Sequence, residues 1–277
     1  ALPFRDGVLG GAWARMSYQH LPKAELPMAL AHLHWASVVG APFRLAVLRG
    51  DHEGHDLPGD DFPGRFFAGW DHEALADAIT GAGFEIQAIN DDGDITWVDS
   101  TRRLSLPDTV APGMGLLVCG LNPSIYSAER GVGYARPGNR FWPAAIAAGI
   151  VSRDRDPRHA LVAHGVGLTD LVKRPTVAAA ELSVEEYRSG VARVERLTAR
   201  FQPDAICFVG LDGWRKAIDR KATPGWQPEP FGGVPAYLMP STSGLNARTS
   251  LDALTAHLRS ASHEGEANPG GATSPGG

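Results

Sequence analysis

The chain has 277 residues, 43% of which are hydrophobic, and a formal net charge of -5. This length and apolar content suit two domains with ordinary hydrophobic cores. The two cysteines are too few for an iron–sulfur cluster, no apolar stretch is as long as a membrane span, and the start of the chain lacks the pattern of a secretory signal, so we expect a cytoplasmic protein.

The charge is distributed unevenly along the chain. Residues 1–111 have 8 Lys and Arg against 16 Asp and Glu, whereas residues 112–260 have 18 against 13. Because phosphate contacts are made by Lys and Arg, the local excess places a polyanionic partner on the second half. A solvated surface of mixed charge is the alternative, and this modest excess by itself favours it.

The first hundred residues have an α/β pattern without an obvious nucleotide-binding loop. Apolar spacing predicts helices at residues 24–37 and 71–81 and strands at residues 42–48, 83–89 and 95–98. Short strands that alternate with helices are typical of a Rossmann-like half-domain.

Two of these segments, residues 24–34 and 70–85, resemble the carboxyl-terminal half of a class I S-adenosylmethionine-dependent methyltransferase. In that fold the glycine-rich turn that holds the cofactor would lie upstream of these residues. We therefore interpret residues 1–106 as a partial methyltransferase-like domain that is inactive in this chain and binds no cofactor. An active methyltransferase is the alternative, and a glycine-rich loop upstream of Ala1 would favour it.

Residues 107–113 contain two prolines and a glycine, which predicts a linker. Beyond the linker, apolar runs and amphipathic segments alternate, which predicts a mainly parallel four-stranded sheet covered by helices on both faces. The predicted strands are residues 115–119, 166–170, 204–209 and 235–239, and the predicted helices are residues 140–149, 157–164, 183–201, 211–220 and 249–260. Residues 261–277 are rich in Gly, Ser, Pro and Glu and are predicted to be disordered.

Two polar loops follow two of the predicted strands. Asn122 comes directly after the first strand of the second half, and the loop from Met239 to Asn246 follows the last one. Ligands of open α/β sheets bind at the carboxyl ends of the strands. We therefore expect both loops to converge on one edge of the sheet and to form the functional site.

Four segments in order resemble the mismatch-specific uracil/thymine branch of the uracil-DNA glycosylase superfamily over residues 112–260. They are Gly120-Leu121-Asn122-Pro123-Ser124, Tyr134 with the run from Pro137 to Trp142, the run from Gly167 to Thr176, and Ser243-Gly244-Leu245-Asn246. Two departures from the family pattern are Ser124, where glycine is usual, and Ser241-Thr242, where Asn-Pro is common. The resemblance implies a three-layer α/β sandwich for residues 114–260.

The resemblance also implies a DNA repair glycosylase of the base excision pathway. Its substrate would be double-stranded DNA with G:U or G:T mismatches, and thymine or ethenocytosine opposite guanine could be released as well as uracil. A DNA partner would associate the cytoplasmic protein with the nucleoid. No lysine stands in a motif position to form a Schiff base, so we expect a monofunctional enzyme that leaves an abasic site. A non-catalytic DNA-damage binder that keeps the pocket is the alternative.

The resemblance assigns Asn122 as the catalytic residue. An amide can orient a water molecule but cannot take its proton as a carboxylate would, so catalysis would rest on positioning and electrostatics. An extruded base would stack on the flat face of Tyr134, and Ser127 would bond the base edge or simply cap the loop. The predicted pocket consists of Gly120, Leu121, Pro123, Ser124, Ser127 and Tyr134.

Leu245 is expected to enter the DNA stack as an apolar wedge, with Ser243, Gly244 and Asn246 beside it. A leucine packed into the core is the alternative for this position. Basic residues near the loops are candidates for phosphate contacts, namely Arg136, Arg140, Lys173, Arg174 and Arg248. The histidine spacings at His32-Leu-His34 and His52-Glu-Gly-His55 do not match a helical zinc pair, so we expect no metal.

Overall fold

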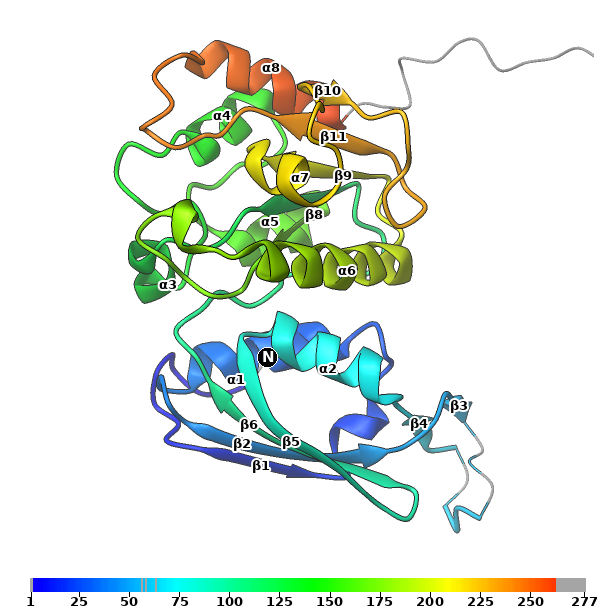
Figure 1. Ribbon diagram of the computed structural model, residues 1–277. Coiled ribbons are helices and arrows are strands. Elements are labelled where there is room, and N and C mark those ends of the chain that lie inside the picture. The colour runs from blue at the N-terminus through cyan, green and yellow to red at the C-terminus, as the bar shows by residue number, and fades with distance from the viewer. Residues whose placement is uncertain (1, 56, 58, 63, 263–277) are drawn as a thin grey trace, which may run out of the picture.

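The computed structural model describes residues 2–55, 57, 59–62 and 64–262, and each half of the chain has its own sheet and helices (Figure 1). In the first half, a four-stranded sheet has the order β1-β2-β6-β5. Only β1 and β2 are parallel. The strands are β1 (Ala12–Arg15), β2 (Pro42–Leu48), β5 (Phe84–Asp92) and β6 (Ile95–Arg102).

Two helices, α1 (Leu26–Ala36) and α2 (His72–Gly81), pack on the same face of this sheet, because their apolar side chains and those of β2, β5 and β6 form one core cluster. The carboxylate of Asp71 accepts a hydrogen bond of 2.8 Å from the backbone N–H of Ala74 and so begins α2. Strand β2 agrees with its predicted bounds, whereas β1 was not predicted. The smaller elements are η1 (Tyr18–His20), β3 (Glu53–His55) and β4 (Phe66–Ala68).

The second half contains a five-stranded sheet of order β10-β11-β9-β7-β8. The four predicted strands are present and parallel: β7 (Leu116–Gly120), β8 (Val166–Asp170), β9 (Ala205–Val209) and β11 (Ala236–Met239). The prediction of four strands is corrected by β10 (Gly225–Trp226), which pairs antiparallel with β11. A strand of two residues is too short to show any hydrophobic period.

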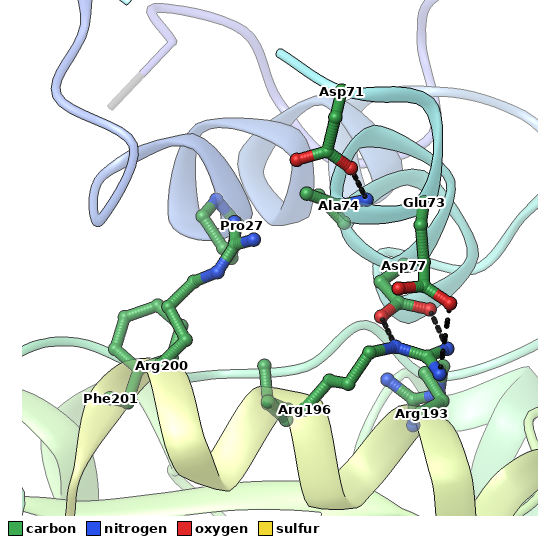
Figure 2. A pocket seen from close by; sticks show the side chains of 11 residues that line it. Pro27, Asp71, Glu73, Ala74, Asp77, Arg193, Arg196, Arg200 and Phe201 are labelled. Atoms are coloured by element: carbon green, nitrogen blue, oxygen red, sulfur yellow. Dashed lines mark hydrogen bonds and ion pairs between the residues drawn. The ribbon is translucent and has the colours of Figure 1, made fainter. Parts of the chain in front are cut away.

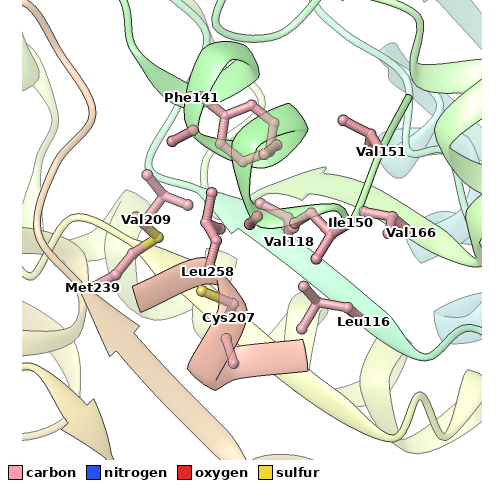
Figure 3. Close-up of a cluster of buried hydrophobic side chains, with 14 of the residues drawn as sticks. Leu116, Val118, Phe141, Ile150, Val151, Val166, Cys207, Val209, Met239 and Leu258 are labelled. Atoms are coloured by element: carbon pink, nitrogen blue, oxygen red, sulfur yellow. The ribbon is translucent and has the colours of Figure 1, made fainter. Parts of the chain in front are cut away.

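Both faces of this sheet are covered, so the second half is a three-layer sandwich. Val118 points into a cluster with α4 (Phe141–Ala148) and α8 (Leu251–Ser262), which Figure 3 shows in close-up. Leu117 and Cys119 point the other way, into a cluster with α6 (Val184–Phe201) and α7 (Asp212–Ala217). The remaining helical elements are α3 (Ile125–Arg130), α5 (Pro157–His164) and η2 (Ala179–Glu181).

The capping box at the start of α6 is confirmed, because Ser183 Oγ accepts from the N–H of Glu186 at 3.1 Å and the carboxylate of Glu186 accepts from the N–H of Ser183 at 2.9 Å. The disordered tail was predicted to begin two residues too early, since Ala261 and Ser262 belong to α8. Residues 263–277 of that predicted tail lie outside the described residues. No helix within the described ranges is both long and apolar enough to cross a membrane.

We call the contact between the two halves of the chain the seam. Charged side chains of α2 and α6 meet there. Figure 2 shows the Arg196 guanidinium turned toward α2, where it bonds both oxygens of Asp77 at 2.6 and 2.9 Å and lies 3.2 Å from Glu73. The first part of the predicted linker is buried in this seam, because Asp108 and Thr109 are only 2% and 1% exposed, whereas Pro112 and Gly113 are exposed. Thr109 also exchanges two backbone hydrogen bonds with Leu168 of β8.

A buried ion cluster lies next to this connection. The carboxylate of Asp108 accepts hydrogen bonds from Lys173 at 2.8 Å, from Arg193 at 2.6 Å and from Thr169 at 2.6 Å. Burial alone would raise the pKa of Asp108, but Arg193 and Lys173 together hold it below its usual value. Asp108 therefore forms ion pairs with two cations of the second half beside the seam.

Candidate active site at the carboxyl edge of the sheet

Asn122 lies at the carboxyl edge of the second sheet, where the sequence places it. The loops after β7 and β8 run side by side, because the N–H of Leu171 donates to the carbonyl of Gly120 at 2.8 Å and that of Val172 donates to Leu121 at 2.9 Å. A third bond of 3.2 Å joins the N–H of Thr176 to the carbonyl of Pro123. Asn122 is thus held between two loops that follow neighbouring strands.

The side chain of Asn122 is fixed through its amide nitrogen. This nitrogen donates to the carbonyl of Arg174 at 2.9 Å, to the hydroxyl of Thr176 at 2.8 Å and to the carbonyl of Pro123 at 3.2 Å. A carbonyl oxygen only accepts, so the NH₂ end of the amide must face these partners. The amide oxygen of Asn122 is the remaining end, and it can accept a hydrogen bond from a water molecule.

Thr176 is a functional candidate that sequence reasoning missed. It is buried, with 4% exposure, and it touches both the side chain of Asn122 and the backbone of Pro123. The signal was present in the run from Gly167 to Thr176, which resembles a family segment but received no catalytic role. Thr176 positions Asn122 and does not by itself supply a reactive group.

Ser124 and Ser127 organise the start of α3. The hydroxyl of Ser124 accepts from the N–H of Ser127 at 3.1 Å and lies 3.1 Å from its hydroxyl, which in turn accepts from the N–H of Ala135 at 3.2 Å. Serine is a favoured N-cap residue, which gives a local reason for its presence where glycine is usual. These contacts match the loop-capping interpretation of Ser127.

Tyr134 lies against the sheet edge in a constrained conformation. Its backbone φ of 58° is in the left-handed region, and its ring stacks on Phe141 with centroids 4.1 Å apart and an angle of 25° between the planes. Phe141 therefore covers one ring face, so a base could stack only on the other. Burial, and then the nearby Asp170 carboxylate, raise the pKa of the Tyr134 phenol well above its usual value.

Asp170 is a second residue that sequence reasoning left without a role. It ends β8 opposite Gly120, and a Cβ on Gly120 would collide with the Asp170 carboxylate and would lie 3.0 Å from the Tyr134 hydroxyl. A larger residue at position 120 would therefore have to displace the Asp170 carboxylate. Burial raises the pKa of Asp170 to about 6, and the positive charges of Lys173 and Arg193 oppose that rise.

The second loop of the site, from Met239 to Asn246, is held in place by Arg140. Its guanidinium donates to the carbonyl of Asn246 at 2.6 Å, to that of Ser243 at 3.3 Å and to that of Thr249. The side-chain nitrogen of Asn246 donates to the carbonyl of Ser241 at 2.8 Å. Leu245, between these anchored residues, is 86% exposed. Exposure of this size does not fit a leucine packed into the core.

The five cations proposed for phosphate contacts differ in availability. Lys173 has a side chain that is only 10% exposed and is paired with Asp108. Arg174 bonds the carboxylate of Glu186 at 2.6 and 3.0 Å, and Arg140 clamps the second loop. Arg136 and Arg248 are exposed and have no ion-pair partner among the described residues. These two are the better candidates for surface phosphate contacts, whereas Lys173, Arg174 and Arg140 have intramolecular roles.

The part of the chain that the structure describes contains no group of three or more His, Cys, Asp or Glu side chains placed to hold a metal ion. Cys119 and Cys207 are buried, as the sequence predicts, and burial raises the pKa of the Cys207 thiol to about 12. The site thus consists of an amide held by its nitrogen end, two serines, a stacked tyrosine, a partly buried carboxylate and an exposed leucine.

Comparisons with solved structures find weak likenesses. A protein of Methanosarcina acetivorans, classed provisionally as a uracil DNA glycosylase, matches 57% of this chain and 98% of its own with 22% identity and a TM-score of 0.41. A 1,6-didemethyltoxoflavin-N1-methyltransferase of Burkholderia thailandensis matches 35% of this chain with 14% identity and a TM-score of 0.30. A SAM-dependent methyltransferase of Methanosarcina mazei matches 37% of this chain with 12% identity and a TM-score of 0.32.

This chain spans only 45% and 63% of the length of the two methyltransferases. At these TM-scores none of the three structures bears on the activity of the chain. The sequence comparison is more decisive, because the profile of the uracil DNA glycosylase superfamily matches residues 107–263, which is more than half of the chain and includes both loops of the site. The chain therefore belongs to the uracil DNA glycosylase superfamily.

Proposed function

We propose that this protein is a monofunctional glycosylase that hydrolyses the N-glycosidic bond of uracil mispaired with guanine in double-stranded DNA. Thymine and ethenocytosine opposite guanine are further candidate substrates. Superfamily membership supports a DNA glycosylase of base excision repair in general. The observation that carries the proposal is the fixed amide of Asn122, whose nitrogen is held by Arg174 and Thr176.

The mechanism begins with extrusion of the base, because the glycosidic bond of a stacked nucleotide is out of reach. The amide oxygen of Asn122 then accepts a hydrogen bond from water and positions it against the anomeric carbon. Asn122 cannot remove the proton, so the water attacks only as the bond to the base breaks. The attacking water then loses its proton to bulk water, and the released pyrimidine anion takes one up. Backbone N–H groups of the loop from Asn122 to Ser127 stabilise the negative charge on the departing pyrimidine, apart from Pro123, which has no N–H, and Ser127, whose N–H donates to Ser124.

The extruded base stacks on the ring face of Tyr134 that Phe141 does not cover. Base–aromatic stacking contributes about 1 to 3 kcal/mol and tolerates different bases. The stack on Phe141 fixes the orientation of the Tyr134 ring before DNA binds. The preference for a mispaired base comes instead from the lower free energy needed to extrude it.

Leu245 fills the space that the extruded base leaves. Its side chain is 86% exposed, and Arg140 anchors the backbone carbonyls of Ser243 and Asn246 on either side of it. An apolar side chain on a rigid loop can enter a base stack with little loss of conformational entropy. Asn246 and its neighbours would then face the unpaired guanine.

For Leu245→Ala we expect weaker cleavage of DNA with an unchanged melting temperature of the free protein. A buried leucine would leave a cavity and cost about 2 to 5 kcal/mol of folding stability, whereas this side chain is exposed. The loss of cleavage should be larger for A:U, where the base is well paired, than for G:U, which opens more easily. Single-turnover rates on both duplexes and thermal denaturation measure these effects.

Val162→Ala provides a matched control, because Val162 is also 86% exposed but lies on α5 before β8 rather than in a loop after a strand. This variant should cleave both duplexes as the wild type does. A clear drop in melting temperature for Leu245→Ala, without a selective loss on A:U, would assign Leu245 to packing.

The proposed activity is tested by a single-turnover assay over duplexes with G:U, G:T, G:ethenocytosine and A:U pairs. We expect base release to be fastest at G:U and the DNA strand to break only after alkali, because the product is an abasic site. Borohydride should trap no covalent complex, since no Schiff base forms. Tight binding to the same duplexes without any base release would identify a DNA-damage binder and reject the proposal.

A further inference from the structure

A pocket of about 670 Å³ lies at the seam, between the sheet of the first half and the loop that follows β8. Arg102 and Arg103 line it from the first half, and Lys173 and Arg174 line it from the second. Glu85 is the one carboxylate among the residues that line it. The pocket therefore has a strongly cationic wall built from both halves of the chain.

Two of these cations have partners outside the pocket. Lys173 pairs with the buried carboxylate of Asp108 at 2.8 Å, and Arg174 pairs with Glu186 at 2.6 Å. Arg103 lies 3.4 Å from Glu85, but both side chains are more than half exposed. An exposed pair of this kind contributes little free energy, so Arg103 can exchange Glu85 for another anion.

Arg102 is different, because it is 9% exposed and its Nε and Nη1 atoms have no hydrogen-bond acceptor among the described residues. A buried guanidinium without a partner is costly, since burial removes its hydration and arginine does not lose its proton readily. The neighbouring His34 offers no negative charge. Its two ring nitrogens are likewise without partners in the described part of the chain, and burial, Arg102 and Lys173 lower its pKa to about 3.

We propose that this seam pocket binds a phosphate group through Arg102 and Arg103. The Nη2 atom of Arg102 supplies a charge-assisted N–H contact and Arg103 a second charge, whereas Nε and Nη1 of Arg102 are shielded from solvent. The phosphate of a DNA strand next to the extruded nucleotide and a free phosphate both have this chemistry. The position favours DNA, because Arg174 lines the pocket and its carbonyl also accepts from Asn122.

The identification of DNA as the source of the bound phosphate rests on the proposed function, whereas the binding of a phosphate group to the pocket does not. If DNA is the source, the first half of the chain contributes to substrate binding although it belongs to no glycosylase motif. The phosphate would also sit beside the loop that fixes Asn122, so DNA contact at the seam and the geometry of the catalytic amide would be physically connected.

The first test is thermal denaturation with inorganic phosphate, compared with chloride at equal ionic strength. Phosphate at ten times its dissociation constant should raise the melting temperature of the wild type by about 2 to 4 °C. Arg102→Gln should lose this rise while folding normally, because the substitution removes an unpartnered buried charge. Arg103→Gln should reduce the rise, and its exposed side chain is not needed for packing. Arg44→Gln, an exposed arginine of β2 paired with Asp99, should keep it.

The second test measures binding of a G:U duplex at several salt concentrations. If Arg102 holds a DNA phosphate, Arg102→Gln should reduce the slope of log K against log salt by about 0.9, while Arg44→Gln leaves it unchanged. A phosphate-specific stabilisation with an unaltered slope supports the pocket and assigns a free phosphate as its ligand. If neither the phosphate effect nor the slope depends on Arg102, the seam pocket is not a phosphate site. Thermal denaturation with inorganic phosphate requires no DNA, so it tests the phosphate site even if the protein releases no base.

Discussion

Replacing Asn122 by alanine should reduce single-turnover release of uracil from a G:U duplex by about 100-fold or more and leave duplex binding nearly unchanged. Loss of one preorganised polar contact in the transition state typically costs about 3 kcal/mol, which corresponds to a factor of this size. Binding should persist because the amide nitrogen of Asn122 is engaged by Arg174 and Thr176 rather than free to hold DNA. Cleavage and binding should be measured on the same duplex.

Thr176→Val tests the positioning role separately. Valine keeps the shape of the side chain but cannot accept the 2.8 Å hydrogen bond from Asn122, so cleavage should fall by less than in Asn122→Ala. Asn90→Ala, at an exposed position of β5, is the matched control and should cleave normally. An unimpaired cleavage rate for Asn122→Ala would remove this residue from the mechanism.

The second large effect concerns the pH dependence of stability. As the pH rises from about 4 to about 7, the wild type should lose about 3 kcal/mol of stability relative to Asp170→Asn. The pKa of Asp170 is raised from 3.8 to about 6 in the folded protein, chiefly by burial. A difference of this size corresponds to about 3 kcal/mol.

The direction of this pH dependence follows from which state of the protein, folded or unfolded, holds the proton on Asp170. Between these two pKa values the folded protein keeps a proton on Asp170 that the unfolded chain has released, so raising the pH favours unfolding. Asparagine is neutral at every pH and lacks this contribution. The two proteins should therefore be similar near pH 4, and the variant should be the more stable one above pH 6.

Urea titrations at closely spaced pH values provide the free energies of unfolding. Asp204→Asn, which removes an exposed carboxylate just before β9, is the control and should follow the wild-type profile. A profile for Asp170→Asn that runs parallel to the wild type over the whole range would mean that the pKa of Asp170 is the same in the folded and the unfolded protein.

The sequence by itself determined the sheet of the second half. Three of the parallel strands, β7, β9 and β11, are buried on both faces and consist of short, almost wholly apolar runs, which located them to within one residue. Strand β8, whose sequence Val-Gly-Leu-Thr-Asp is more polar, was located as closely. The capping box at Ser183 and Glu186 was equally predictable from the sequence, because its two hydrogen bonds join residues that are three positions apart. Parallel strands also require their carboxyl ends to meet, which placed Asn122 and Leu245 at one edge.

The sequence was less informative where elements are short. Strand β10 has two residues and α3 has six, so neither shows a periodic pattern. The burial of part of the predicted linker could not be predicted from its composition. Asp108 is buried because it pairs with Lys173 and Arg193, which are 65 and 85 residues away along the chain.

Only the tertiary structure decided which side chains of the site are free to contact a ligand and which are engaged within the protein. Arg140 and Lys173 look like free cations in the sequence, yet one clamps the second loop and the other pairs with Asp108. Thr176 reaches Asn122 across 54 residues, and burial against other segments raises the pKa of Asp170 to about 6. Hydrogen-bond partners and burial depend on contacts between residues distant in the chain, whereas residue type and local periodicity are properties of the sequence alone.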